Sequence, residues 1–196
     1  MSNVIANLLV NGSSPVKVGG SGTTAKYFPA VPGASIGVAS SAVGYVYVPG
    51  SNQVNGQRMS VDITGSYTLD PTDASSPTVL VEVVATTNPT AASPTYTVIA
   101  TSGSVASSGI GTASDSFGFS IQMFGDNVSG LVSGTYNCIM NGAQKNTPPA
   151  VLTNNLTGIN FAPTGGGPTF ALAVRVTFSV TGAANSASLY QFVISA

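Results

Sequence analysis

The feature that most constrains this chain is the strict alternation of side chains along residues 170–180. Every even-numbered position in that stretch is Phe, Leu or Val, and the positions between them are Ala, Arg, Thr or Ser. Successive side chains of a β-strand point to opposite faces, so a period of two indicates a strand with one buried face. The chain is therefore expected to build a sheet that covers a hydrophobic core.

Further apolar or alternating runs predict eight more strands, at 44–48, 61–69, 79–84, 96–100, 117–123, 135–140, 156–161 and 189–194. The run at 79–84 is almost wholly apolar, which is typical of a central strand. Gly65 interrupts its own run and is expected to mark a β-bulge. The 23 Gly and 12 Pro are spread through the whole chain, so helices are not expected.

The predicted strands follow one another at intervals of roughly ten to twenty residues, and several connections are long. This spacing favours an all-β fold, an antiparallel β-sandwich of the jelly-roll type, over residues 41–196. Residues 1–40 differ, because they are rich in Gly, Ser and Ala and contain Pro15, Pro29 and Pro32. We expect them to form an extended N-terminal arm or irregular lead-in, with a short strand at 5–10, that a neighbouring subunit orders.

Charged residues are scarce, at 6% of the chain, with five Lys or Arg, six Asp or Glu and a net charge of −1. An ordinary soluble domain has about 25%. Binding to nucleic acid or to an anionic membrane needs many basic contacts, so neither is expected as a partner. A surface with so little charge lacks the usual repulsion against association, which indicates that a partner or further copies of the chain cover much of it.

The residues of common catalytic sites are missing. General acid–base catalysis most often uses His or a carboxylate with a tuned pKa, and the chain has no His. Asp62 and Glu82 occupy outward positions of predicted strands, where they are expected to be solvated. Asp70 and Asp73 flank Pro71, as turn residues do. We therefore predict no catalytic residue and no enzymatic activity.

Metal and cofactor sites are not predicted either. Zinc needs a cluster of Cys or His, and the single cysteine, Cys138, is expected to be a small buried apolar residue. The acidic turn described above and Asp126 could each offer oxygens to calcium, but turn chemistry explains both. The glycine-rich stretches at 19–24 and 165–168 lack the Lys-Ser or Lys-Thr pair of a phosphate-binding loop.

The N-terminus carries no basic segment, and Asn3, Asn7 and Asn11 interrupt its apolar run, so a secretory signal is not predicted. No stretch approaches the roughly 18 apolar residues of a membrane helix. We therefore expect synthesis in the cytoplasm of a host cell, without insertion into a membrane.

The long alternating strand at 173–180 is followed by Ala187-Ser188-Leu189-Tyr190-Gln191-Phe192 near the end of the chain. Together with the signal-free Met-Ser-Asn start, the Gly/Ser/Ala-rich lead-in and the scarcity of charge, this C-terminal third resembles the small jelly-roll capsid decoration (cement) proteins of tailed bacteriophages. The resemblance implies a virion structural protein on the capsid surface. Such a protein binds the major capsid protein of the same virion, bridges neighbouring capsomers, and itself forms a dimer or trimer.

The resemblance carries over no functional residues, so candidate contacts come from the arm and from the proline-containing loops. The candidates are Val4, Ile5, Leu8, Tyr27, Phe28, Pro148, Pro149 and Pro168. Tyr45 and Tyr47 point the same way on a predicted strand and could stack on a sugar, although a structural role is favoured.

Three other functions stay open. A phage tail or receptor-binding module would share the fold and recognise a bacterial surface glycan or protein. A self-assembling jelly-roll capsid protein would form particles by itself, although residues 1–40 lack the basic arm with which such proteins usually bind genome. A carbohydrate-active enzyme that uses Asp70 or Asp73 is the least favoured class.

Overall fold

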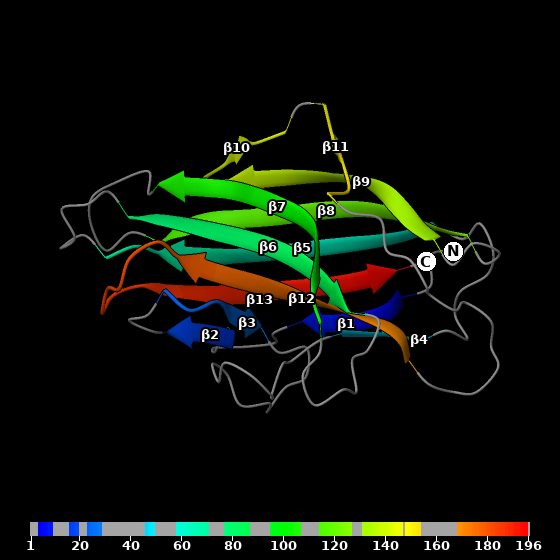
Figure 1. Cartoon of the computed structure of the whole chain (residues 1–196), viewed down its shortest axis with the longest axis horizontal. Coiled ribbons are helices and arrows are strands. Elements are labelled where there is room, and N and C mark those ends of the chain that lie inside the picture. The colour runs from blue at the N-terminus through cyan, green and yellow to red at the C-terminus, as the bar shows by residue number, and fades with distance from the viewer. Residues whose placement is uncertain are drawn as a thin grey trace.

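The computed structural model describes residues 4–9, 16–19, 23–28, 46–49, 58–70, 77–86, 95–106, 114–126, 131–146, 148–153 and 168–195. Within these ranges the chain forms β-strands and no helix (Figure 1). The strands are β1 (Val4–Leu9), β2 (Val16–Gly19), β3 (Lys26–Phe28), β4 (Val46–Pro49), β5 (Arg58–Thr68), β6 (Thr78–Thr86), β7 (Thr97–Ala106), β8 (Asp115–Asp126), β9 (Leu131–Met140), β10 (Ala143–Gln144), β11 (Ala150–Val151), β12 (Pro168–Phe178) and β13 (Ser186–Ser195).

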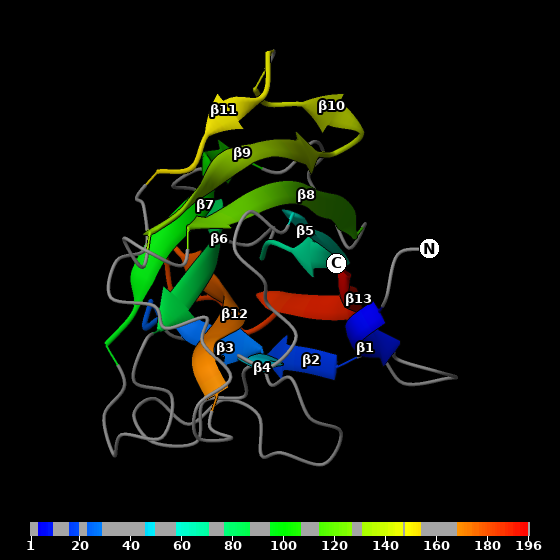
Figure 2. The same cartoon turned by 90° about the vertical axis from the view of Figure 1, so that its right-hand side faces the viewer.

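These strands form two antiparallel sheets. Sheet A has the order β1-β13-β5-β8-β9-β10, with β2 also paired to β13 and β11 also paired to β9. Sheet B has the order β3-β12-β6-β7, with β4 also paired to β12. The sheets stack as two layers around one hydrophobic core (Figure 2). The expected antiparallel β-sandwich is therefore confirmed.

The alternation at 170–180 corresponds to β12, whose inward Leu172, Val174, Val176 and Phe178 are at most 1% exposed. The run at 79–84 corresponds to β6, which lies between β12 and β7 as a central strand should. The predicted strand at 156–161 lies outside the described residues.

Gly65 lies at a bulge, but the extra residue is on the neighbouring strand. The pairing of β13 with β5 shifts between Leu189 and Gln191, so Tyr190 is the additional residue opposite Gly65. A Cβ atom at Gly65 would overlap the ring of Phe117 on β8 and the carbonyl oxygen of Ser188. Glycine is required here because an aromatic ring packs directly on the backbone.

The described parts of residues 1–40 belong to both sheets. β1 pairs with the second half of β13 and β2 with the first half, while β3 pairs with the middle of β12. The short strand predicted at 5–10 is β1. β1 contacts β4 and β2 contacts β3, so the N-terminal edges of the two sheets meet. The rest of the predicted arm lies outside the described residues.

A tight hairpin joins β9 to β10 at Asn141 and Gly142, with φ of 55° and 73°. Left-handed values at both positions are those of a type I′ turn. The backbone amide of Asn141 donates to the Ser116 carbonyl at 2.8 Å. The side-chain oxygen of Asn141 accepts from the Tyr67 hydroxyl, also at 2.8 Å. The turn is therefore fixed to both β5 and β8.

Candidate protein-contact surfaces

Among the described residues, no group of three His, Cys, Asp or Glu side chains could hold a metal ion. Asp70 is 5% exposed and ties the end of β5 to the turn after β12. Its carboxylate accepts from the Ala184 amide at 3.1 Å, and its own amide donates to the Asn185 side chain at 2.9 Å. The bond that the Asp70 carboxylate accepts comes from a turn distant in sequence, whereas Pro71, Asp73 and the local turn expected there lie outside the described residues.

Cys138 is fully buried on β9, as expected for a small apolar residue. Burial raises the pKa of its thiol from 9.0 to about 12, because the thiolate would lose its solvation, and Lys145 opposes this shift only partly. The thiol therefore stays neutral and unreactive in the folded chain at ordinary pH.

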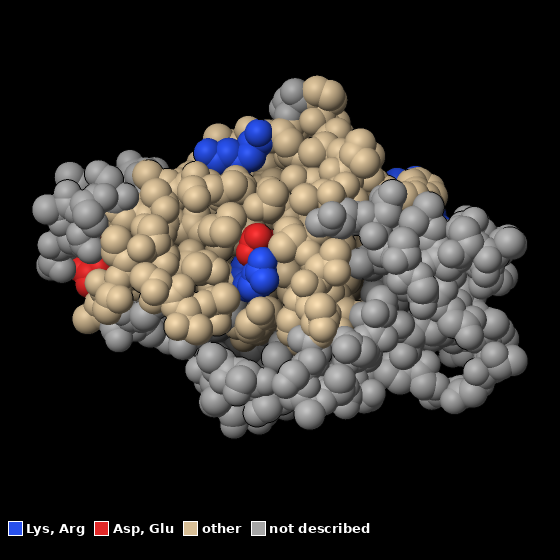
Figure 3. Space-filling view, viewed as in Figure 1, with Lys and Arg blue, Asp and Glu red and all other residues tan. Residues whose placement is uncertain are grey.

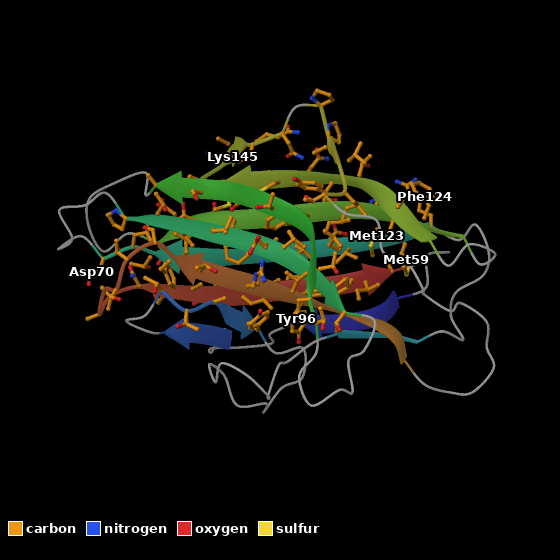
Figure 4. All side chains as sticks on the ribbon, in the orientation of Figure 1. Met59, Asp70, Tyr96, Met123, Phe124 and Lys145 are labelled. Carbon is orange, nitrogen blue, oxygen red and sulfur yellow. The ribbon has the colours of Figure 1, made fainter. Side chains whose placement is uncertain are left out.

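A projecting edge is built beside β9. β10 pairs with the end of β9, β11 pairs with its middle, and the chain between them leaves the sheet (Figure 1). We call residues 144–149 the edge segment; residue 147 in it is not described. Its labelled residue, Lys145, lies on the projection beyond β9 (Figure 4).

The side chain of Asn146 holds the edge segment in place. Its amide nitrogen donates to the Tyr136 carbonyl at 2.6 Å, and its amide oxygen accepts from the Cys138 backbone amide at 2.7 Å. These are bonds that a neighbouring strand's backbone would make, so Asn146 replaces a strand residue where the chain bulges outward. Gln144 adds a bond from its side chain to the Asn146 carbonyl at 2.8 Å. The described part of the segment is thus held to β9 as a protrusion.

The outer side of the edge segment is exposed and carries one charge at its described residues. Gln144, Lys145, Pro148 and Pro149 are all exposed, and Val151 just beyond them is 71% exposed. Proline has no amide hydrogen and cannot continue a ladder, so the two prolines also prevent strand addition at this edge. The predicted contacts Pro148 and Pro149 therefore lie on the projection itself.

The free edge of sheet B is blocked in a similar way. Along β7, the carbonyl of Ile99 accepts from the Thr153 amide at 2.9 Å, and that of Thr101 accepts from the Tyr136 hydroxyl at 3.4 Å. The pairing of β7 with β6 also shifts twice, and Gly103 has a φ of 63°. A partner strand would find few regular backbone groups here, so contacts through faces are favoured over contacts through edges.

The outer face of sheet A is lined by short, mostly neutral side chains, and we call it the serine–threonine face. Its outward positions on β5, β8 and β9 are Ser60, Asp62, Thr64, Ser66, Thr68, Ser116, Gly118, Ser120, Gln122, Ser133, Thr135 and Asn137. Arg58, at the start of β5, is the one cation on these three strands. Its guanidinium donates to the Gln122 side chain at 2.5 Å and lies 5.9 Å from the centre of the Phe124 ring.

All four large hydrophobic side chains that are exposed in the described part of the chain lie on this same side of sheet A. Phe124 and Ile139 are outward residues of β8 and β9, each 46% exposed, and Val151 is opposite the outward Thr135. Tyr190, also 46% exposed, shares a 2.7 Å hydrogen bond with the outward Ser66.

The outer face of sheet B is different, because its own side chains cover it. Glu82 on β6 accepts from Arg175 on β12 at 2.7 Å, with side chains 10% and 23% exposed. Figure 3 views this face and shows one acidic and basic pair in the middle of it. The hydrogen bond that the Arg175 guanidinium donates to Glu82 raises the pKa of the guanidinium further above its ordinary value. The prediction of a solvated Glu82 is wrong, because a cation from a strand distant in sequence faces it.

Two tyrosines bridge the outer face of sheet B. The rings of Tyr27 on β3 and Tyr96 just before β7 lie 4.9 Å apart, although β12 and β6 separate their strands. Since neighbouring strands are about 4.8 Å apart, the two side chains must reach toward each other across the face. Val84 and Ala173, which point outward beneath this region, are at most 1% exposed.

The remaining candidate contacts do not gather at one place. Val4, Ile5 and Leu8 lie on β1, at the opposite edge of sheet A from Pro148 and Pro149.

On sheet B, Phe28 pairs opposite Val174 and Pro168 opposite Pro49. Tyr45 is not described, whereas Tyr47 lies on β4 opposite Ala171. The structure thus separates the candidates into three regions, and it adds Asn146 and the serine–threonine face, which the sequence patterns do not single out.

No helix long and apolar enough to cross a membrane occurs in the part of the chain that the structure describes. Comparisons with family models, with curated proteins and with solved structures found no match to this chain.

Proposed function

We propose that this chain is a structural virion protein that binds the outside of a tailed-phage capsid and stabilises it by bridging capsomers. The observation that carries the proposal is the edge segment, an exposed projection that Asn146 fixes to β9 through bonds of 2.6 and 2.7 Å. A contact element that is already ordered loses little conformational freedom on binding, so a small surface can still bind firmly.

The rest of the described exterior supports adhesion to protein. The edges at β9 and β7 resist strand addition, and the serine–threonine face has few charges to desolvate. Small neutral contacts are weak one at a time, but many copies on a shell make them collectively strong. On a capsid, the added contacts would have to break before the shell yields to the pressure of packaged DNA.

The strand order supports a jelly roll. If β1 with β2 and β3 with β4 each count as one interrupted strand, and β9 to β11 as an insertion, eight strands remain. Numbered along the chain, they follow the orders 1-8-3-6 and 2-7-4-5 in the two sheets. Jelly rolls, which are common in viral capsid proteins, arrange their eight strands in two such sheets.

The same strand order favours one second candidate, a capsid protein that assembles a shell by itself. The two functions differ in what the pure protein does. A decoration protein stays a small oligomer until particles are added, whereas a shell protein forms closed particles visible by electron microscopy.

The test uses expanded capsids of the parent phage that lack this protein. Added protein should bind them at a fixed ratio and raise the temperature at which they release DNA. Asn146→Ala should weaken binding while the protein stays folded, and Thr177→Ala on the outer face of sheet B should not. Absence of capsid binding, together with specific binding to a bacterial glycan or surface protein, would replace the proposal with a receptor-binding module.

Deletion of residues 2–30 is a poor test of an N-terminal arm. The described parts of that segment, β1, β2 and β3, pair with β13 and β12. Their removal would expose both strands, so any loss of capsid binding could follow from damage to the sandwich.

A further inference from the structure

We propose that the Asn141–Gly142 turn is a site of slow self-modification, in which Asn141 becomes an aspartate or an isoaspartate and the edge segment is loosened from β9. The reaction needs only water and the chain itself. The modification does not depend on the proposed function. Only its consequence for the virion, a gradual loss of capsid binding, rests on that function.

The turn presents both reacting groups to solvent. The side-chain amide of Asn141 is next to the backbone nitrogen of Gly142, and Gly142 is exposed while Asn141 is half-buried. A Cβ atom at Gly142 would meet no atom within 4 Å, so the space around the glycine is open. Glycine rotates at little steric cost and has no side chain to shield its nitrogen. Water and base can therefore reach the pair while both sheets stay folded.

Tyr67 prepares the amide for attack. Its hydroxyl donates to the side-chain oxygen of Asn141 at 2.8 Å. Negative charge develops on that oxygen when a nucleophile adds to the amide carbon, and a donor already in place stabilises such a charge. Burial above all, and the Asp115 carboxylate in addition, raise the pKa of Tyr67 to about 12, although Asn141 opposes the shift. The hydroxyl therefore keeps its proton at mildly alkaline pH, where the reaction is fastest to observe.

The reaction consumes one water and releases one ammonia. A base in the solvent takes the amide proton of Gly142, and the nitrogen adds to the side-chain carbon Cγ of Asn141. The bond from Cγ to Nδ2 breaks, and ammonia leaves with a proton from the solvent. Water then opens the cyclic imide at either carbonyl. One opening gives aspartate, and the other gives isoaspartate, in which the backbone runs through Cγ.

Both products carry a carboxylate that the unmodified turn does not have. Asp115 is 9% exposed and pairs opposite Tyr67, and its charge acts on the Tyr67 hydroxyl. Two carboxylates would then lie beside one hydroxyl, and like charges at one site repel each other. The reaction itself therefore weakens the bond that ties the turn to β5.

Isoaspartate also lengthens the turn, because it adds one carbon atom to the backbone. Loop length fixes the register of a hairpin, and a type I′ turn has two residues. The turn leads directly into β10 and the edge segment, where the Lys145 amide donates to the Cys138 carbonyl at 2.8 Å. This bond should open more often once the turn is altered, so the projection loses its fixed position.

The first test follows the reaction. Wild-type protein is kept at mildly alkaline pH, and peptide mass spectrometry with an isoaspartate assay locates the products. Asn141 should be converted to both products. Tyr67→Phe keeps the ring and removes the donor, so it should slow the conversion of Asn141 severalfold. Asn11 and Asn55, which also precede glycine, are the reference within the same chain and should react at unchanged rates.

The second test measures the consequence directly. Asn141→Asp reproduces one product and should accelerate hydrogen exchange at the Lys145 amide about tenfold, because the two carboxylates repel each other. Asp115→Asn in the same chain removes the repulsion and should restore most of the protection. Asp62→Asn, on the outer face of sheet A, is the matched control and should restore none. Circular dichroism checks that every variant keeps its β-sheet spectrum.

Three results would overturn the modification site. They are an Asn141 that stays unchanged while Asn11 and Asn55 react, a Tyr67→Phe chain that reacts as fast as the wild type, and unchanged exchange at Lys145 in Asn141→Asp. The capsid assay is separate. Modified protein that still binds capsids fully contradicts the edge segment as the capsid contact, whereas fresh protein that ignores capsids removes only the proposed function.

Discussion

In both sheets, outward residues alternate with core residues along the strands. The two outer faces nevertheless differ in how far their side chains are exposed to solvent. On sheet B, Glu82 and Arg175 neutralise each other at 2.7 Å, and the Tyr27 and Tyr96 rings meet across the strands. On sheet A, the outward side chains are too short to cover the backbone, and the exposed apolar residues stand among them. One face is therefore covered by its own side chains, while the other is more open to solvent.

This difference shows that an outward strand position is not by itself an exposed position. Val84 alternates out of the core as Asp62 does, yet Val84 is buried and Asp62 is partly exposed. What separates them is the set of cross-strand neighbours, which depends on register. Substitutions on each face, and titration of the core between them, test this difference between the two sheets.

The largest effect is expected from alkaline pH, which acts on the shared core. Burial raises the pKa of Cys138 from 9.0 and that of Tyr67 from 10.0, each to about 12. Above pH 9 the unfolded chain releases protons that the folded chain retains, so stability falls as pH rises from about 9 to 12. A shift of three units corresponds to about 4 kcal/mol at most for the thiol. Urea denaturation at several pH values measures this loss.

Cys138→Ala is the control for the thiol, because it removes the titrating group. Its stability should fall less steeply above pH 9 than that of the wild type. Equal slopes would mean that burial does not raise the pKa of the Cys138 thiol.

Removing Glu82 should distinguish the two faces directly. Glu82→Ala leaves the Arg175 guanidinium, 23% exposed, without its charged partner, and should destabilise the fold by about 2 kcal/mol. Asp62→Ala is the matched change on sheet A and should alter stability by less than ~0.5 kcal/mol. Thermal unfolding in dilute solution, where any dimer dissociates, compares the two. Similar losses for both variants would contradict the contrast between the faces.

Asn146→Ala should have an intermediate effect on stability. It removes the hydrogen-bond partner of the Tyr136 carbonyl and of the Cys138 backbone amide, which only water could then replace. We expect a loss of about 1 kcal/mol for the two partly buried bonds. Amide hydrogen exchange should accelerate at Cys138 and Lys145 and stay unchanged along β6. Unchanged protection at Cys138 would show that the edge segment does not depend on this side chain.

The long strands could be predicted because their register signal is local. Every other residue of β12 and β5 is apolar, and a period of two is visible without knowledge of the neighbours. β10 and β11 could not be predicted in this way, since each has only two residues and so shows no period. The Asn141-Gly142 turn was predictable in principle, because Asn-Gly is the strongest short-range hairpin signal.

The candidate surfaces were less accessible to prediction. Pro148 and Pro149 stand out in the sequence as breakers, but nothing local shows that they lie on a supported projection. The pairing of Glu82 with Arg175 joins residues 93 positions apart, so a solvated carboxylate was the natural expectation. The serine–threonine face emerges only when β5, β8 and β9 are placed side by side, because each strand alone contributes a few ordinary polar residues.

The smallest effect on stability is expected at Tyr190. Removing its hydroxyl oxygen tests whether the outer face of sheet A holds its side chains less firmly than that of sheet B. Tyr190→Phe removes the hydroxyl that bonds Ser66 at 2.7 Å and keeps the ring. Because Tyr190 is 46% exposed, water can replace part of the bond, and the loss of stability should be about 0.5 kcal/mol. The ring should become more mobile, which a broader aromatic NMR signal or faster fluorescence depolarisation would report.

Tyr27→Phe is the comparison on sheet B, where the ring packs against Tyr96 at 4.9 Å and should keep its order. If instead the Tyr27 ring loosens and the Tyr190 ring does not, sheet A holds its side chains as firmly as sheet B, and its outer face is not the open one.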